Sequence, residues 1–411
     1  MKKTFIFAPA TYNLAEVTRM LEIANAVKDR FNCIFIGYGG DYENLIEETD
    51  FEYIKMEPRL SPEKIEHIYK VDKGEKEGQL FTKKELLERV NSEIALYKRL
   101  MPSGVVTGFC MGVYLSTKIS RIPLISVMQS TWTREYYDKG LGTWPDLLDI
   151  PPINWIPEKT LNAFGSKGFM FMTKWFLMSF NQAAKALSIN RFNDLADLLT
   201  GDINLLAEPE GFSEITSKDL PPNFHFIGPL IGRLDSEVPQ EVLHMPKDLP
   251  IVYFAMGSSG TPEIVAKIIE GFEGKPYRVI APVKAHIEKL NIKVPDNVII
   301  TDWLPSHKVN PIASLSLIHG GVGTVMTACL AGTPVVGVAM QPEQEANLEC
   351  LVRKGFAIRI KKKRISAEAI LKAIDELIND EKAAAKARDF QQVIMKWDNL
   401  SGVADIFDRL P

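Results

Sequence analysis

The chain has 411 residues, which is more than a single hydrophobic core usually organises, so we expect two domains. Hydrophobic residues make up 46% of the sequence and charged residues 24%, and the net charge is -4. These values describe a globular protein. They exclude the overall basic excess that is typical of nucleic-acid binders.

The cysteines indicate reduced thiols. Cys33, Cys110, Cys329 and Cys350 are scattered without a Cys-x-x-Cys pair, and three of them lie in apolar runs. The N-terminus is charged and then apolar, as in a signal peptide, but its apolar run breaks at Pro9 and is better interpreted as a first strand. We therefore expect a cytoplasmic protein.

Short strands and helices alternate along the first half. A strand is predicted at residues 4–8, a helix at 14–29 and a strand at 33–37. The charged segment 61–100 is interpreted as a solvated helical insertion. Further strands are predicted at 104–107, 123–128, 186–189 and 204–207. This alternation predicts an α/β fold with a doubly wound parallel sheet.

The apolar stretch at residues 168–180 allows two interpretations. It is too short to span a membrane and contains Lys174, so a buried helix is the simpler prediction. The alternative is a surface that lines an acceptor site or touches a membrane peripherally. No transmembrane segment is predicted.

A second α/β half begins after a linker. Residues 224–230 close the first half, and the Pro-rich, charged residues 232–249 are typical of an interdomain linker. The apolar run 251–256 predicts a buried strand, and a loop at 257–260 leads into a helix with Thr261 as cap and Pro262 at its first position. That helix start suits an anion.

The segment 302–347 is the most informative part of the chain. The apolar run 316–318 meets His319-Gly320-Gly321-Val322-Gly323-Thr324, a helical pattern ends at Gly332, and another strand follows. Glycines let the backbone approach a ligand, and the amides and dipole of a helix start favour a phosphate. The loop is therefore interpreted as a diphosphate cradle. Trp303 precedes it, and Glu343, Gln344 and Asn347 follow it.

This ordered pattern resembles the donor-binding signature of the UDP-glycosyltransferase family, and in particular its natural-product enzymes. The resemblance implies the GT-B fold, with two Rossmann-like domains facing across a cleft. Residues 1–231 would form an N-terminal acceptor-binding domain and 250–382 a nucleotide-sugar donor domain, with 232–249 as linker. The C-terminal segment 383–411 would pack back on the N-terminal domain.

The resemblance implies roles for the site residues. Trp303 would lie against the nucleobase, with a core aromatic as the alternative, and His319 would meet the diphosphate, with a structural strand-end histidine as the alternative. Glu343, where the family commonly has Asp, and Gln344 would hold sugar hydroxyls. The remaining predicted donor residues are Ser258, Ser259, Leu304, Gly320, Gly321, Gly323, Thr324 and Asn347.

The acceptor base departs from the family pattern. Glu16 stands where many members have histidine, and Gly108 stands where many have the aspartate that orients it. Glu16 is a candidate general base, but Asn13-Leu14-Ala15-Glu16 equally fits a helix capping box. The two departures also fit a lost base.

The predicted function is inverting, metal-independent transfer of a sugar from a UDP- or dTDP-sugar to a small, apolar or lipid-like acceptor, without a cofactor. Candidate acceptor residues are Asn13, Met111, Tyr114 and Trp132. The alternatives are a GT-B pseudoenzyme or auxiliary nucleotide-binding protein and, less favoured, a sugar-nucleotide epimerase. Nucleic-acid partners are not expected, and the sequence leaves acceptor, sugar and oligomeric state open.

Overall fold

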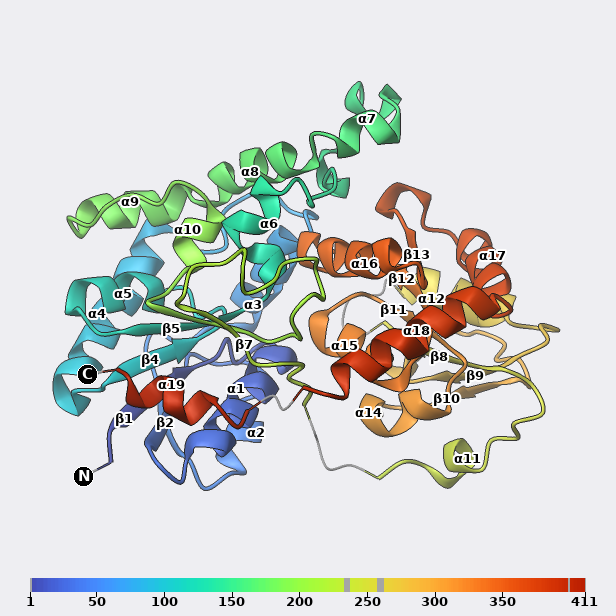
Figure 1. Cartoon of the computed structure of the whole chain (residues 1–411), viewed down its shortest axis with the longest axis horizontal. Coiled ribbons are helices and arrows are strands. Elements are labelled where there is room, and N and C mark those ends of the chain that lie inside the picture. The colour runs from blue at the N-terminus through green and yellow to red at the C-terminus, as the bar shows by residue number, and fades with distance from the viewer. Residues whose placement is uncertain (1, 233–236, 257–261, 398–399, 411) are drawn as a thin grey trace. The chain divides into compact units, whose positions relative to one another are not determined.

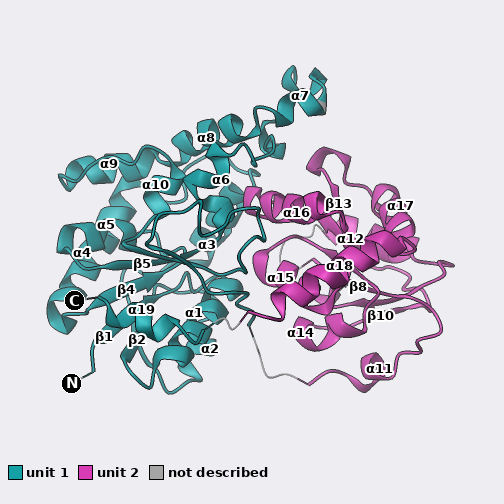
Figure 2. Ribbon diagram, in the orientation of Figure 1, with its two compact units in different colours: residues 1–232, 398–411 teal, residues 233–397 magenta. Residues whose placement is uncertain are grey.

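The computed structural model describes residues 2–232, 237–256, 262–397 and 400–410 (Figure 1). The chain forms two compact units: unit 1 comprises Met1–Gly232 and Asp398–Pro411, and unit 2 comprises Arg233–Trp397 (Figure 2). Of the segment 383–411 that was expected to return to the N-terminal domain, only the residues from 398 belong to unit 1. Among the described residues, no helix combines the length and apolarity needed to cross a bilayer.

Unit 1 is built on a seven-stranded parallel sheet in the order β3-β2-β1-β4-β5-β6-β7. Its strands are β1 (Thr4–Ala8), β2 (Asn32–Gly37), β3 (Glu52–Lys55), β4 (Gly104–Thr107), β5 (Leu124–Met128), β6 (Ile203–Leu206) and β7 (Phe224–Phe226). Its helices are α1 (Leu14–Val27), α2 (Asn44–Glu47), α3 (Pro62–Asp72), α4 (Lys83–Leu100), α5 (Val113–Ser120), α6 (Arg134–Asp138), α7 (Glu158–Asn162), α8 (Gly165–Phe176), α9 (Met178–Ala186), α10 (Leu195–Leu199) and α19 (Val403–Asp408), with short 3-10 turns at Ser130–Trp132, Asp146–Leu148 and Ile153–Trp155.

A hydrophobic core fills the space between the sheet of unit 1 and the helices α1 and α19. Phe5 from β1 contacts Phe407 from α19, with ring centroids 4.7 Å apart, and Phe31 lies against both rings. All three side chains are nearly inaccessible to solvent. Burial of such aromatic surface, roughly 2 kcal/mol or more per side chain, holds the end of the chain on unit 1.

Unit 2 has a six-stranded parallel sheet in the order β10-β9-β8-β11-β12-β13. Its strands are β8 (Ile251–Ala255), β9 (Arg278–Ala281), β10 (Val298–Ile300), β11 (Leu315–Ile318), β12 (Val335–Val338) and β13 (Ala357–Ile360). Its helices are α11 (Gln240–Leu243), α12 (Pro262–Gly271), α13 (Lys284–Ile287), α14 (Ser306–Val309), α15 (Val322–Ala331), α16 (Pro342–Lys354), α17 (Ala367–Leu377) and α18 (Glu381–Ile394), with 3-10 turns at Asn310–Ile312 and Lys362–Arg364. Helix α18 packs against α15, which explains why it belongs to unit 2.

Two predictions about elements were wrong. Residue 186 ends α9 and residues 187–188 form a turn, so the strand at 186–189 does not exist. The segment 61–100 is not a solvated insertion, because α4 packs against α5 and α9 and buries Leu86, Val90 and Leu96. The segment 232–249 contains α11, whose Val242 is fully buried.

Candidate functional site

The predicted donor residues gather at one edge of the sheet of unit 2. His319 follows β11, Trp303 follows β10, and the segment from Ala339 leads from β12 into α16. All of these strands are parallel, so their carboxyl ends share an edge. In doubly wound folds ligands bind outside this edge. Ser258 and Ser259 lie outside the described residues.

The glycine loop has a backbone that other residues would strain. Gly320 has φ +92°, and a Cβ there would lie 2.7 Å from the side chain of Leu348 and 2.9 Å from the carbonyl oxygen of Gln344. Asn347 secures the loop from α16, since its Nδ2 donates to the Gly320 carbonyl at 3.1 Å. A Cβ on Gly323, by contrast, would meet nothing within 4 Å. The loop is thus closely packed against α16 at Gly320, whereas the space around Gly323 at the start of α15 is open.

Helix α15 begins at this loop with its N-terminus unoccupied by a cap. Among the described residues, no side chain accepts a hydrogen bond from its first amides, and the N-cap position is Gly321. The first turn contains Gly323 and Thr324, both partly exposed, and His319 immediately upstream is half-buried. Amides and the positive end of the helix dipole point to the place where an anion would bind.

The polar residues of α16 are tied into the turn that begins the helix. Gln344 accepts a hydrogen bond from the Met340 amide at 2.9 Å, and Asn347 donates to Glu343 at 2.8 Å. Gln344 and Asn347 are buried, whereas Glu343 is partly exposed. Glu343 is therefore the most accessible of the three, Asn347 holds both Glu343 and the Gly320 loop, and Gln344 holds the turn at Met340.

Trp303 is 49% exposed while the adjacent Leu304 is 3% exposed. The alternative that Trp303 is a core aromatic is therefore wrong. A large exposed aromatic at the ligand edge of a sheet offers a flat face for a base. Leu304 packs inside the unit and supports the segment that carries Trp303.

In unit 1, Glu16 makes a contact that neither sequence interpretation contained. Its Oε2 accepts a hydrogen bond from the Phe109 amide at 2.8 Å, and its Oε1 lies 3.5 Å from Arg19. A Cβ on Gly108 would lie 2.7 Å from the Glu16 Cδ and closer still to both oxygens. The carboxylate of Glu16 therefore lies in the space that a side chain at position 108 would occupy. The glutamate at position 16 thus requires the glycine at position 108, and the two departures from the family pattern are linked.

The capping-box alternative holds only in half. Asn13 caps α1 by accepting from the amides of Ala15 and Glu16 at 2.9 and 3.3 Å. In a complete capping box the Asn13 amide would donate to the Glu16 carboxylate. Here it donates to the carbonyl of Ala10 at 2.8 Å. The Glu16 carboxylate instead joins α1 to the loop after β4.

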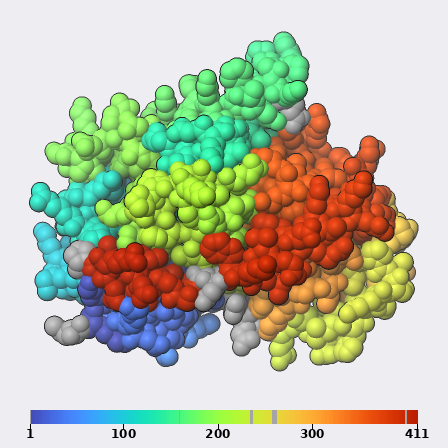
Figure 3. Space-filling view, in the orientation of Figure 1, coloured from blue at the N-terminus to red at the C-terminus, as the bar shows by residue number. Residues whose placement is uncertain are grey.

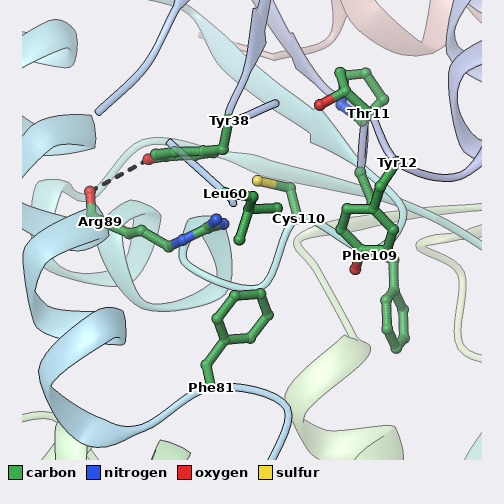
Figure 4. A pocket seen from close by; sticks show the side chains of 10 residues that line it. Thr11, Tyr12, Tyr38, Leu60, Phe81, Arg89, Phe109 and Cys110 are labelled. Carbon is green, nitrogen blue, oxygen red and sulfur yellow. Dashed lines mark hydrogen bonds between the residues drawn. The ribbon is translucent and has the colours of Figure 1, made fainter. Parts of the chain in front are cut away.

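A pocket opens beside this contact at the carboxyl ends of β1, β2 and β4 (Figure 4). Its walls are largely aromatic and include Tyr12, Tyr38, Phe81 and Phe109, with the guanidinium of Arg89 between them. Glu93, one turn further along α4, is fully buried and accepts from the Tyr38 hydroxyl at 2.8 Å. Burial raises the pKa of Glu93 to about 7, against the hydrogen bonds from Ser116 and Tyr38 that lower it.

The predicted acceptor residues have different settings within unit 1. Met111 and Tyr114 are fully buried, and the Tyr114 hydroxyl donates to the Gly108 carbonyl at 2.7 Å, so both belong to the packed interior. Asn13 is the helix cap. Trp132 is partly exposed and meets Phe169 edge to face, with centroids 5.9 Å apart.

The sequence interpretation missed Arg89 and Glu93. A signal for them existed: both lie on the face of α4 that also presents Leu86, Val90 and Tyr97, so charged residues occupy core positions of an amphipathic helix. Treating 61–100 as a solvated insertion concealed that pattern.

Comparison with known proteins agrees with the two-sheet fold. The kitacinnamycin glycotransferase structure matches with a TM-score of 0.68 at 18% identity, over 99% of this chain and 98% of that one. The spinosyn rhamnosyltransferase SpnG matches with a TM-score of 0.67 at 13% identity, over 99% and 100%. These likenesses establish the GT-B fold.

Curated relatives extend over most of the chain. A PGL/p-HBAD biosynthesis rhamnosyltransferase from Mycobacterium bovis is 22% identical over 392 residues, which are 94% of this chain and 84% of the relative. A PGL/p-HBAD biosynthesis glycosyltransferase from Mycobacterium tuberculosis is 23% identical over 316 residues, 76% and 72% of the two chains. The family model for UDP-glucoronosyl and UDP-glucosyl transferase matches residues 158–390, more than half of the sequence. The chain therefore belongs to the UDP-glucoronosyl and UDP-glucosyl transferase family and is an enzyme that transfers sugars.

Proposed function

We propose that the enzyme transfers a sugar from a UDP- or dTDP-sugar to a small, largely apolar acceptor with inversion at the anomeric carbon. The observation that carries the proposal is the uncapped N-terminus of α15 with His319 beside it, at the ligand edge of the unit 2 sheet. As the bond between the anomeric carbon and the diphosphate oxygen breaks, negative charge grows on the diphosphate. Aimed amides stabilise such charge by preorganised electrostatics.

Unit 1 would supply the acceptor side of the reaction. The aromatic side chains around the small pocket suit contact with a flat or apolar acceptor. Glu16 is the candidate base that takes the proton from the attacking hydroxyl as the new carbon–oxygen bond forms. The Phe109 amide donates to the Glu16 carboxylate and Arg19 lies beside it, so the side chain is held in place. Because leaving-group charge would be met by amides and His319, we propose that no metal ion is required, and excess EDTA should leave turnover unchanged.

The relatives support this class of donor and acceptor. One neighbouring structure is the spinosyn rhamnosyltransferase SpnG complexed with thymidine diphosphate, and another is the glycosyltransferase VinC in complex with DTDP. Two relatives carry the description rhamnosyltransferase or glycosyltransferase of PGL/p-HBAD biosynthesis. A deoxysugar donor is thus as admissible as a glucosyl donor.

Calorimetric titration with UDP and dTDP tests the donor site. His319→Ala should weaken binding of the preferred nucleotide at least tenfold, since a hydrogen bond to a charged group contributes about 1.5 to 3 kcal/mol. His244→Ala, at an exposed position on the end of α11, is the matched control and should bind as the wild type does. Unchanged nucleotide affinity in His319→Ala would remove the basis of the proposal.

Turnover tests the base. Glu16→Gln keeps an oxygen that can accept from the Phe109 amide but removes the basic carboxylate. We expect turnover to fall about 100-fold or more, the usual contribution of a general base, with nucleotide affinity unchanged. Near wild-type turnover would leave Glu16 with a purely structural role.

A further inference from the structure

The pocket of unit 1 contains a buried cation held by aromatic rings. The Arg89 guanidinium carbon lies 4.0 Å from the centroid of the Tyr38 ring and 4.6 Å from that of Phe81. Arg89 is only 3% exposed. The two rings bind the cation through its faces, as cation–π contacts do, and leave the edge with its N–H donors for other partners.

Two buried donors at this pocket have no acceptor among the residues that the structure describes. Within the described part of the chain, neither the Arg89 Nη2 nor the Tyr12 hydroxyl has a hydrogen-bond partner, although both atoms are buried and both residues line the pocket. Among the same residues, no carboxylate lies within ion-pair distance of Arg89. Burying such donors without an acceptor is unfavourable, so a ligand that supplies the acceptors is favoured.

We infer that this pocket receives the carboxylate end of the sugar acceptor, with Arg89 and Tyr12 as its donors. The cavity volume is only about 10 Å³, so the body of the acceptor would lie outside it. A guanidinium edge matches the two oxygens of a carboxylate, and the tyrosine hydroxyl adds a third donor. The inference rests on the proposed function only in naming the ligand as the acceptor. Binding itself can be measured without donor.

The test compares benzoate with neutral benzamide by calorimetry on the full chain. Arg89→Met, which keeps an unbranched apolar side chain between the rings, should lower benzoate affinity at least tenfold and leave benzamide unchanged. Arg99→Met, at an exposed position on the same helix, should behave as the wild type. If Arg89→Met proves unfolded, Arg89→Lys is the deciding variant. The lysine ammonium group keeps the positive charge but lacks the paired N–H donors of the guanidinium, so benzoate binding should still be weaker.

Two results overturn the carboxylate site. One is a wild-type protein that binds benzoate no better than benzamide, and the other is an Arg89 variant with undiminished benzoate affinity. Nucleotide titration on the same preparations separates this failure from failure of the proposed function, since UDP and dTDP binding depends on unit 2.

A second, independent feature is an exposed apolar stripe along α8 and the start of α9. Phe164, Phe171, Trp175 and Met178 are 50%, 72%, 46% and 49% exposed. Their spacing of seven, four and three residues places them on one helix face. The opposite face is buried in unit 1 through Phe169, whose ring stacks on Tyr137 with centroids 4.6 Å apart. The buried-helix prediction for 168–180 was therefore wrong for this outer face.

Basic residues are interleaved with the stripe. Lys167 and Lys174 are exposed on the same face. Residues 159–191 contain four lysines and one arginine and neither Asp nor Glu, although the whole chain has a net charge of -4. Just upstream, Ile150, Trp155 and Ile156 are also exposed, Trp155 by 79%. Figure 3 shows atoms of this green segment at the surface of the molecule.

We propose that this face of α8 binds the surface of an anionic lipid bilayer. Aromatic side chains enter the headgroup region, and lysines extend their charged ends to lipid phosphates while their stems cover apolar surface. A protein partner is less suited, because the cores of protein interfaces are depleted in lysine. The binding would be peripheral and would bring the enzyme to acceptors dissolved in the membrane.

Vesicle flotation tests the lipid-binding face. Wild-type enzyme should float with vesicles of 30% phosphatidylglycerol in phosphatidylcholine, less with pure phosphatidylcholine, and less again in 1 M salt, where the screening length is about 3 Å. Lys167→Gln with Lys174→Gln should weaken binding about thirtyfold, because each basic residue near an anionic surface contributes about fivefold. Phe171→Ala with Trp175→Ala should weaken it at least tenfold.

Matched controls lie on α18 and just beyond it. Val393→Ala with Met395→Ala, and Lys382→Gln with Lys396→Gln, remove exposed residues of the same kinds and should float as the wild type does. Equal flotation of the α8 variants and the wild type overturns the proposal. So does a result in which Phe171→Ala with Trp175→Ala lowers affinity for a soluble apolar acceptor while vesicle binding is unchanged, which would assign the stripe to acceptor binding.

Discussion

Gly108→Ala probes the contact between Glu16 and the loop after β4. The added methyl group would overlap the Glu16 carboxylate, so the carboxylate must move. Gly108 itself does not have a positive φ, so the substitution acts through this contact and not through backbone strain. Movement breaks the 2.8 Å hydrogen bond from the Phe109 amide in a site where Glu16 is only 5% exposed.

The magnitude follows from that bond. A hydrogen bond to a charged group contributes about 1.5 to 3 kcal/mol, and a glutamate side chain moves at little packing cost of its own, so Gly108→Ala should lower the free energy of unfolding by about 2 kcal/mol. In a Glu16→Ala background the space is already vacated. There Gly108→Ala should cost no more than about 0.5 kcal/mol, the usual range for a substitution without a specific contact.

The assay is a double-mutant cycle by urea denaturation. The four proteins should give a coupling energy of about 1.5 to 2 kcal/mol between the two positions, as expected for residues in contact. Gly402→Ala, where a Cβ would meet nothing within 4 Å, is the control and should change stability little. Additive effects of Gly108→Ala and Glu16→Ala would refute the claim that the carboxylate occupies the space beside Gly108.

Other expected outcomes concern both units. Gly320→Ala should weaken nucleotide binding and lower stability by about 1 to 3 kcal/mol, because φ is +92° and Leu348 blocks the Cβ, whereas Gly323→Ala, with open space, should leave stability nearly unchanged; calorimetry and thermal melts measure both. Trp303→Ala should reduce affinity for the nucleotide by about 1 to 3 kcal/mol and leave that for the sugar 1-phosphate unchanged, and equal losses would contradict base stacking. Glu93, whose pKa is raised to about 7 from 4.5 by burial, binds its proton more tightly in the folded state, so stability should fall as pH rises from about 4.5 to 7 and then level off. The free energy of unfolding should fall by an amount on the order of 3 kcal/mol, which follows from the size of the pKa shift of Glu93. In urea denaturation, Glu93→Gln should lack this part of the pH dependence.

The sequence by itself determined the class of fold and the position of the glycine loop. Apolar runs bounded by turns located strands such as 104–107, which matches β4, and 251–256, which contains β8. The glycines after residue 318 are local requirements of a tight strand-to-helix turn, and Gly320 has the positive φ that such a turn needs. These features depend on neighbours within a few residues, so a sequence pattern records them.

Only the tertiary structure decided which side chains meet across long stretches of chain. Glu16 meets the Gly108-Phe109 backbone from 92 and 93 positions away, and Arg89 stacks on Tyr38 from another element. Nor could hydrophobicity alone orient α8, whose two faces are both apolar. Burial of a helix face is set by what packs against it, and for the stripe from Phe164 to Met178 unit 1 covers only the opposite face. Contact and exposure are properties of the assembled layers, and for that reason the sequence located the glycine loop but not the pocket around Arg89 or the exposed face of α8.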